Sequence, residues 1–342
     1  MAEVPRTTLV TFPAGTVRGR SRVLAAHRLP DGSVGLVAEQ TPFHPLDHSW
    51  PDQPADCGTA EIGGVVYPVI DSLTGAYGPD GQFALGPAIP VRRGDESWTW
   101  VVVHLVEALP DPAAAVGREV MLSVDPERRL ALSAAHTGCH LFSLALNEAL
   151  ADRWPGAVDE APQDGRTAPV APSGPAGSAE GAQAADGPQT AAAAEPGGPA
   201  RAEKAAGVRT DSLGHPDFDA VAIESSRMDV TASTDRYRIG KSLRRKGFQA
   251  EGLREALPRL TAQINARLTS WVTTDAEVRV ETGGPGLTDR RQWICELPAA
   301  TAKVSCGGTH LTRLGEVVAW TTSLSLSEDG TELLAVTTPK RS

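Results

Sequence analysis

Two segments that lie far apart in the chain each carry a pair of side chains able to bind a metal ion. The first contains His136 and His140, and the apolar stretch 141–146 that follows them predicts a helix. On a helix, residues four positions apart share a face with Cβ atoms about 5–6 Å apart, so both imidazoles can reach one ion. The second contains Cys306 and His310 at the same spacing, with two glycines between them. A common site requires the fold to bring these segments together.

The donor atoms of these four residues favour a particular kind of metal. Three imidazoles and one thiolate form a borderline-soft set that suits zinc better than calcium or magnesium. Cys139 lies between the two histidines of the first segment and could compete as a ligand, but a packed thiol is the better interpretation. A histidine pair on a helix can also be no more than a hydrogen-bonded polar group. The downstream pair makes a zinc site of His136, His140, Cys306 and His310 the stronger hypothesis.

The two segments resemble motifs of a known family. Residues 136–141 (His-Thr-Gly-Cys-His-Leu) resemble the His-Thr-x-x-His-Leu motif of the AlaX-type alanyl-tRNA editing proteins. Residues 306–310 resemble their Cys-Gly-Gly-Thr-His motif, and Gly-Glu follows at 315–316. These proteins are free-standing relatives of the editing domain of alanyl-tRNA synthetase and share a domain with threonyl-tRNA synthetase. The resemblance implies a zinc-dependent deacylase that removes serine, or as a second candidate glycine, from alanine tRNA.

A third segment extends the resemblance and also departs from it. Residues 41–45 resemble the family's Thr-x-Phe-Tyr-Pro motif, with His44 in place of tyrosine, and Gln53 matches the glutamine that follows. The resemblance places Thr41 on the serine hydroxyl and Gln53 in the catalytic pocket. The family's glycine-rich turn is replaced by residues 47–52, which implies a different pocket mouth. An aspartate that usually precedes the family's cysteine is missing from 300–305, and such a loss can weaken metal affinity about 10–100-fold.

The pattern of apolar residues predicts an α+β fold with two parts. Residues 1–124 contain short β-branched runs separated by turns, and the strongest strand signal at 98–106 includes His104, most simply a strand histidine. We expect a small β-barrel-like domain there. Residues 125–342 are expected to form the α+β zinc-binding editing domain. Its predicted elements are a helix from Asp125 to about Arg153, a helix over 249–271 kinked or broken at Pro258, and strands at 278–281, 292–297, 317–326 and 333–338.

Residues 157–207 differ sharply in composition from the rest. Alanine, proline and glycine dominate, and aromatic residues are absent. Such a segment buries too little apolar area to offset the entropy lost on ordering. We therefore predict a disordered insertion in a surface loop, which costs little because loop-closure entropy grows only logarithmically with length.

The charge distribution bears on a nucleic-acid partner. The chain carries a net charge of −10, which argues against a general nucleic-acid binder but permits a small contact with the acceptor end of tRNA. One dense positive cluster lies at 236–246. A solvated basic face is one interpretation, and contact with tRNA phosphates is the other. The candidate tRNA-binding residues are Arg236, Arg238, Lys241, Arg244, Arg245 and Lys246.

Other features narrow the class of protein. No apolar run is long enough to span a membrane, the N-terminus lacks a secretory pattern, and four scattered cysteines do not suggest a disulfide framework, so we expect a cytoplasmic protein. No nucleotide-binding motif appears, so no nucleotide cofactor is expected. Two alternatives stay open: a metallohydrolase of the same fold acting on another aminoacyl ester, and a non-catalytic protein with structural zinc. The second draws on the fact that four protein ligands describe a closed zinc site.

Overall fold

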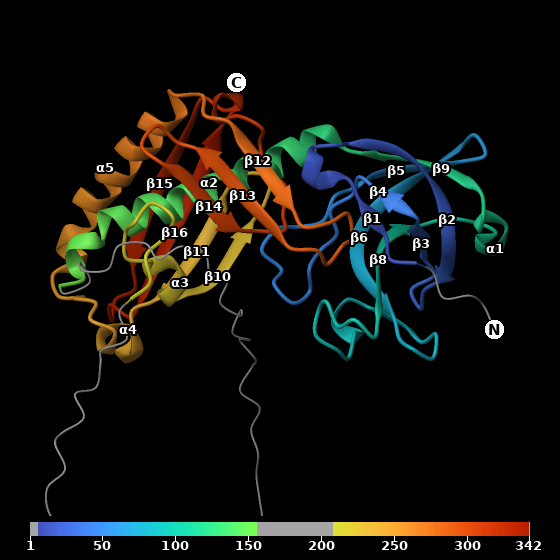
Figure 1. Ribbon diagram of the computed structural model, residues 1–342, viewed down its shortest axis with the longest axis horizontal. Coiled ribbons are helices and arrows are strands. Elements are labelled where there is room, and N and C mark those ends of the chain that lie inside the picture. Colours follow the sequence, from blue (N-terminus) through green and yellow to red (C-terminus); the bar gives the residue numbers. More distant parts are fainter. Residues whose placement is uncertain (1–5, 156–207, 342) are drawn as a thin grey trace, which may run out of the picture.

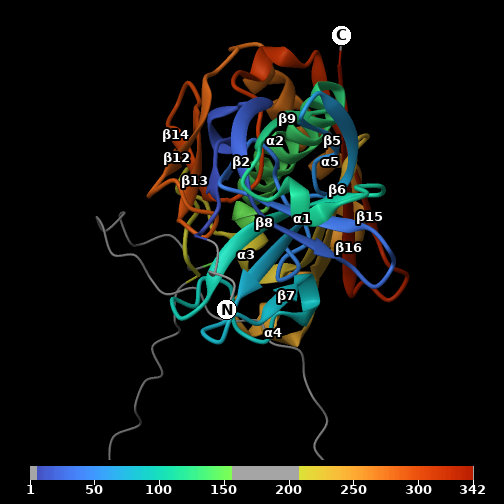
Figure 2. The ribbon, with the colours of Figure 1, turned by 90° about the vertical axis from the view of Figure 1, so that its right-hand side faces the viewer.

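A closed β-barrel and an α+β region lie side by side along the long axis of the molecule (Figure 1). The computed structural model describes residues 6–155 and 208–341. The predicted insertion at 157–207 lies outside the described residues. Figure 2 views the molecule from the barrel side. Among the described helices, none is both long and apolar enough to cross a membrane.

Six antiparallel strands close the barrel in the order β5-β9-β2-β3-β8-β6, and β6 pairs with β5 to complete the ring. This confirms the small barrel predicted for this part of the chain. The strands are β2 (Arg18–Arg28), β3 (Val34–Ala38), β5 (Gly58–Ile62), β6 (Val65–Tyr77), β8 (Thr99–Val106) and β9 (Glu119–Val124). Alternating apolar residues, among them Leu36 and Leu122, fill the interior.

Shorter elements extend the barrel. Strand β7 (Phe83–Leu85) adds to β6, while β1 (Leu9–Val10) pairs in parallel with β4 (Gln40–Thr41). A short helix, α1 (Pro112–Ala115), and the 3-10 turns η1 (Phe12–Ala14) and η2 (Gly86–Ala88) complete this part.

Helix α2 (Pro126–Ala149) leads from the barrel into the α+β region (Figure 1). The Asp125 side chain accepts hydrogen bonds from the backbone N–H groups of Glu127 and Arg128, and Pro126 occupies the first helical position, so the predicted helix start is confirmed. The helix ends at Ala149 and is followed by η3 (Ala151–Arg153). It is buried along most of its length, which explains its nearly continuous apolar sequence after residue 140.

The α+β region has two antiparallel sheets. One has the order β10-β11-β16-β15 and the other β12-β13-β14. Their strands are β10 (Ile223–Met228), β11 (Ser233–Arg238), β12 (Val278–Thr282), β13 (Arg291–Glu296), β14 (Thr301–Ser305), β15 (Ala319–Leu326) and β16 (Glu332–Lys340). The mixed architecture agrees with the α+β expectation.

Helices α2 and α5 (Leu253–Val272) pack on each other and on the four-stranded sheet, α2 over β11 and β16 and α5 over β15. The remaining elements are α3 (Phe218–Ala222), α4 (Lys241–Arg245) and η4 (Leu314–Glu316). Helix α5 corresponds to the helix predicted over 249–271, but it continues through Pro258 without a break. The cost of the missing backbone donor is offset by burial of Leu260, Ile264 and Leu268 in the core.

Candidate metal centre

The fold brings the two distant ligand pairs together. His136 and His140 lie on α2, and Cys306 and His310 lie in the loop that follows β14. One ligand atom from each residue lies within 4.8 Å of all the others. The Cys306 Sγ atom is 3.3 Å from Nε2 of His136 and 3.3 Å from Nε2 of His310. A zinc tetrahedron with bonds of about 2.0–2.3 Å has edges of about 3.3–3.8 Å, so this spacing suits one ion.

The protonation states of these side chains are also suited to binding a cation. Burial lowers the pKa of His136 to about 3 and those of His140 and His310 well below their usual value, so the imidazoles are neutral and keep a lone pair. Nε2 of His140 is buried and has no hydrogen-bond partner within the described residues. Burial raises the pKa of Cys306 to about 12, so a thiolate there needs an adjacent positive charge. The cluster is therefore compatible with zinc.

Gln53 holds the first ligand in place. Its side-chain carbonyl Oε1 accepts a hydrogen bond from Nδ1 of His136 at 2.7 Å and another from the backbone N–H of Thr309 at 3.0 Å. Its amide Nε2 donates to the Thr309 hydroxyl at 2.9 Å. With the proton on Nδ1, the lone pair of His136 Nε2 faces the Cys306 sulfur. Gln53, which the resemblance places in the catalytic pocket, thus lies beside the cluster and orients the candidate ligand His136.

The loop after β14 approaches α2 closely at Gly308. A Cβ atom at this position would overlap the His136 ring and would lie 2.7 Å from Oε1 of Gln53. Gly307, the residue before it, has open space where its Cβ would lie. The second glycine of the Cys-Gly-Gly-Thr-His segment is therefore required by contact with a ligand, and the first is not.

Asp52 is a neighbour of the centre that the sequence did not reveal. Its Oδ2 atom lies 3.7 Å from Nε2 of His136, and burial raises the pKa of this carboxyl to about 6. It belongs to the 47–52 turn that departs from the family pattern. Only the tertiary fold brings this turn to α2, so no local signal in the sequence indicates the contact.

Thr41 makes its hydroxyl contacts inside the barrel. Its hydroxyl is fully buried, 2.7 Å from Nε2 of His104, whose Nδ1 donates to the Leu36 carbonyl at 3.0 Å. Nε2 is therefore the acceptor, and the Thr41 hydroxyl donates to it while accepting from the Phe43 N–H at 3.1 Å. Both the donor and an acceptor site of this hydroxyl are engaged within the barrel, which disfavours the expected contact with a serine substrate.

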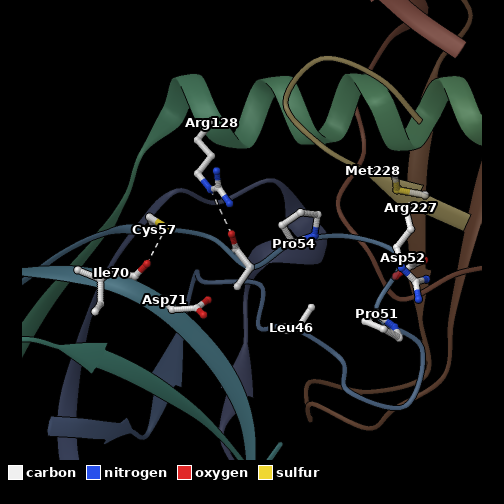
Figure 3. Close-up of a pocket in the computed structure, with 11 residues that line it drawn as sticks. Leu46, Pro51, Asp52, Pro54, Cys57, Ile70, Asp71, Arg128, Arg227 and Met228 are labelled. Carbon is white, nitrogen blue, oxygen red and sulfur yellow. Dashed lines mark hydrogen bonds between the residues drawn. The ribbon is translucent and has the colours of Figure 1, made fainter. Parts of the chain in front are cut away.

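A cavity of about 210 Å³ is lined by His310 itself, and two others lie on the Asp52 side of the cluster. A cavity of about 80 Å³ is bounded by the Gly307–Gly308 backbone and by side chains that include His44, Asp52 and Arg93. A larger cavity of about 320 Å³ shares Asp52 with it (Figure 3). Its other polar lining includes Asp71, Arg128 and Arg227, and its apolar lining includes Leu46, Pro51, Ile70 and Met228.

The predicted basic cluster lies elsewhere. Arg236 pairs with Glu332 at 2.8 Å, and Arg238 pairs with Glu224 at 2.6 Å. Asp235 on β11 contacts Cys139 on α2, so its side chain lies on the face of the sheet that α2 covers. Side chains alternate along a strand, so Arg236 and Arg238 point to the opposite face. Lys241, Arg244, Arg245 and Lys246 lie on or next to α4, at the far end of the α+β region (Figure 1). A role in tRNA binding stays a prediction for these residues.

Comparison with known proteins gives one partial relationship. No protein-family model matches the chain. The alanine–tRNA ligase of Pyrobaculum neutrophilum is 32% identical over 151 residues, which cover 44% of this chain. The match spans 13% of that enzyme's length. Part of the chain is therefore similar to part of an alanyl-tRNA synthetase.

Proposed function

We propose that this protein is a metal-dependent hydrolase that removes a small, wrongly attached amino acid from alanine tRNA, with serine as the first candidate and glycine as the second. The observation that carries the proposal is the convergence of two imidazoles on α2 with a thiol and an imidazole from the loop after β14. The relationship to alanyl-tRNA synthetase over part of the chain supports an aminoacyl-tRNA substrate.

Zinc held by His136, His140, Cys306 and His310 would supply Lewis-acid polarisation of the ester carbonyl. Gln53 keeps His136 oriented through the 2.7 Å hydrogen bond. Four protein ligands describe a closed site, so substrate would enter only if one ligand yielded its place, if a fifth ligand were accepted, or if the ion oriented the substrate while a water or a tRNA hydroxyl attacked. We take His310 as the ligand that would yield, because its Nδ1 has only a 3.4 Å contact with the Thr137 hydroxyl, whereas Nδ1 of His136 lies 2.7 Å from Gln53.

The 320 Å³ cavity supports binding of the nucleotide that carries the ester. Its volume lies at the lower end of the range for small-molecule sites, about 300–1,000 Å³. Arg128 and Arg227 line it together with apolar side chains, which suits a phosphate attached to a flat, largely apolar base. Asp52 lines this cavity and its Oδ2 lies 3.7 Å from Nε2 of His136, so a nucleotide bound here would have its ester directed toward the metal ligands.

The decisive experiment measures deacylation of serine-charged alanine tRNA by the wild type and by His136→Ala. We expect a loss of rate on the order of 100-fold or more, because the variant removes a ligand and not only a group that orients one. His215→Ala, which changes a half-exposed histidine outside the cluster, serves as the matched control and should keep full activity. Equal rates for wild type and His136→Ala would refute metal-dependent deacylation.

Two observations favour the alternatives. The 47–52 turn brings Asp47, Trp50 and Asp52 to the small cavity where glycines were expected, which favours a different aminoacyl ester. A panel of tRNAs charged with different amino acids would identify it. The closed set of four ligands favours structural zinc, whose signature is unfolding on chelation without turnover of any charged tRNA.

A further inference from the structure

His44 lines the small cavity next to the metal ligands. It replaces the tyrosine expected at this position, and only 7% of its surface is exposed. One contact holds the backbone of His44 and another packs against its ring. Its backbone N–H donates to Asp56 Oδ2 at 2.6 Å, and its imidazole packs edge-on against Phe12 with ring centroids 5.0 Å apart. The imidazole thus forms part of the wall of the cavity.

This imidazole has an unmet hydrogen-bonding requirement. Nδ1 of His44 is buried and has no partner within the described residues. A buried polar atom left without a partner costs about 1–3 kcal/mol, so a ligand hydroxyl that meets Nδ1 once the ring turns toward the cavity gains correspondingly. Burial, with nearby cationic side chains adding to it, holds the pKa of His44 well below its usual value, so the ring is neutral.

The chemistry of a neutral imidazole selects the group that can complete this bond. Depending on the tautomer, Nδ1 either donates or accepts one hydrogen bond. A hydroxyl can do both, so it satisfies Nδ1 in either tautomer, whereas a methyl group or a hydrogen atom satisfies neither. The cavity is small, about 80 Å³, which suits a small side chain.

We propose that His44 recognises the side-chain hydroxyl of the amino acid to be removed, in the cavity bounded by Gly307, Gly308 and Asp52. The inference rests on the proposed deacylase function and names the residue that sets its specificity. It moves the serine contact away from Thr41, whose hydroxyl is engaged with His104 and Phe43 inside the barrel. A site that hydrogen-bonds a hydroxyl discriminates against the analogue that lacks it, which here is the correctly charged alanine.

The test compares deacylation of serine-charged and alanine-charged alanine tRNA. In His44→Leu, the ratio of the two kcat/KM values should fall about 10–100-fold, since the variant removes the hydrogen bond and keeps an apolar wall. His44→Asn places a polar atom near the position of Nδ1 and should restore most of the ratio. Thr41→Val is the matched control, and its ratio should match that of the wild type because its hydroxyl does not line this cavity.

A binding measurement separates this inference from the proposed function. Amide-linked seryl- and alanyl-adenosine are not hydrolysed, and calorimetry with the wild type and the two His44 variants gives their affinities without turnover. Suppose that the wild type binds the seryl analogue selectively but deacylates nothing, and that His44→Leu loses this selectivity. That result would support recognition by His44 and refute the hydrolase. Unchanged serine preference in a folded His44→Leu, or its loss in Thr41→Val instead, would overturn the inference and leave the hydrolase standing.

Discussion

Single side chains in this protein connect parts that are distant in sequence, and Gln53 is the clearest case. Its amide group forms hydrogen bonds with His136, a candidate metal ligand, and with Thr309 in the loop that carries the other ligands. A side chain with both donor and acceptor groups is needed for this pair of contacts, which explains why glutamine and not glutamate suits the position. Its neighbour Asp52 contributes a carboxylate on the opposite side of the same ring. Two adjacent residues thus contact the same candidate ligand, His136.

His104 leads to a prediction about pH. Burial lowers its pKa to about 4, and the hydrogen bond to the Leu36 carbonyl opposes this only in part. The unfolded histidine titrates near pH 6.5. Folding therefore favours the neutral form. The contribution of His104 to the free energy of unfolding is fully present above pH 6.5 and is lost as the pH falls through 4. The total loss attributable to this residue approaches about 3 kcal/mol.

Urea unfolding of the wild type and His104→Gln at pH 7.5, 5.5 and 4.0 measures this effect. Glutamine does not titrate, so the variant should lose less stability than the wild type between pH 7.5 and pH 4.0. The other buried histidines contribute equally to both proteins and cancel in the comparison. Parallel pH profiles for the two proteins would show that His104 does not titrate on unfolding.

At the scale of elements, the loop after β14 is shaped by its approach to α2. Gly308→Ala would push a Cβ atom into the His136 ring and against Gln53, so the ring or the loop has to move. We expect metal affinity to fall about 10–100-fold, as for the loss of a group that orients a ligand. Gly307→Ala is the matched control, because nothing lies within 4 Å of its Cβ position. Competition with a chromophoric zinc chelator measures both affinities, and equal values for the two variants would contradict the close approach.

Local signals in the sequence account for many elements but not for their partners. Asp125 and Pro126 specify the start of α2 through capping, and the β-branched run at 99–106 specifies β8, because these signals depend on neighbouring residues only. The histidine and cysteine spacing likewise identified the ligand candidates. The pairing of Thr41 with His104 depends on register across the barrel, and the contact of Asp52 with His136 depends on how the barrel docks. Neither is encoded in local periodicity.

At the scale of the whole molecule, the barrel and the α+β region are joined by polar contacts around the centre. The buried Arg129 of α2 pairs with Asp56, and its guanidinium also donates to the Pro42 carbonyl at 2.7 Å. The backbone N–H of Met228, at the end of β10, donates to the Asp52 carbonyl at 2.8 Å. Since removing one partner of a buried ion pair leaves a charge uncompensated, these contacts favour a fixed arrangement of the two parts.

Removal of the metal should therefore weaken both parts of the molecule. The ion would hold α2 to the loop after β14, and Gln53 connects the same centre to the barrel. Binding at a free metal concentration about 1,000 times Kd stabilises the folded state by about 4 kcal/mol. A chelator should abolish this contribution and lower the unfolding midpoint of the wild type, while His136→Ala should respond little.

Amide hydrogen exchange should speed up on chelation in peptides from β8 as well as from β16. Faster exchange in β16 alone would show that the centre stabilises only the α+β region, and no change in either, with no metal in the purified protein, would show that the cluster holds no ion.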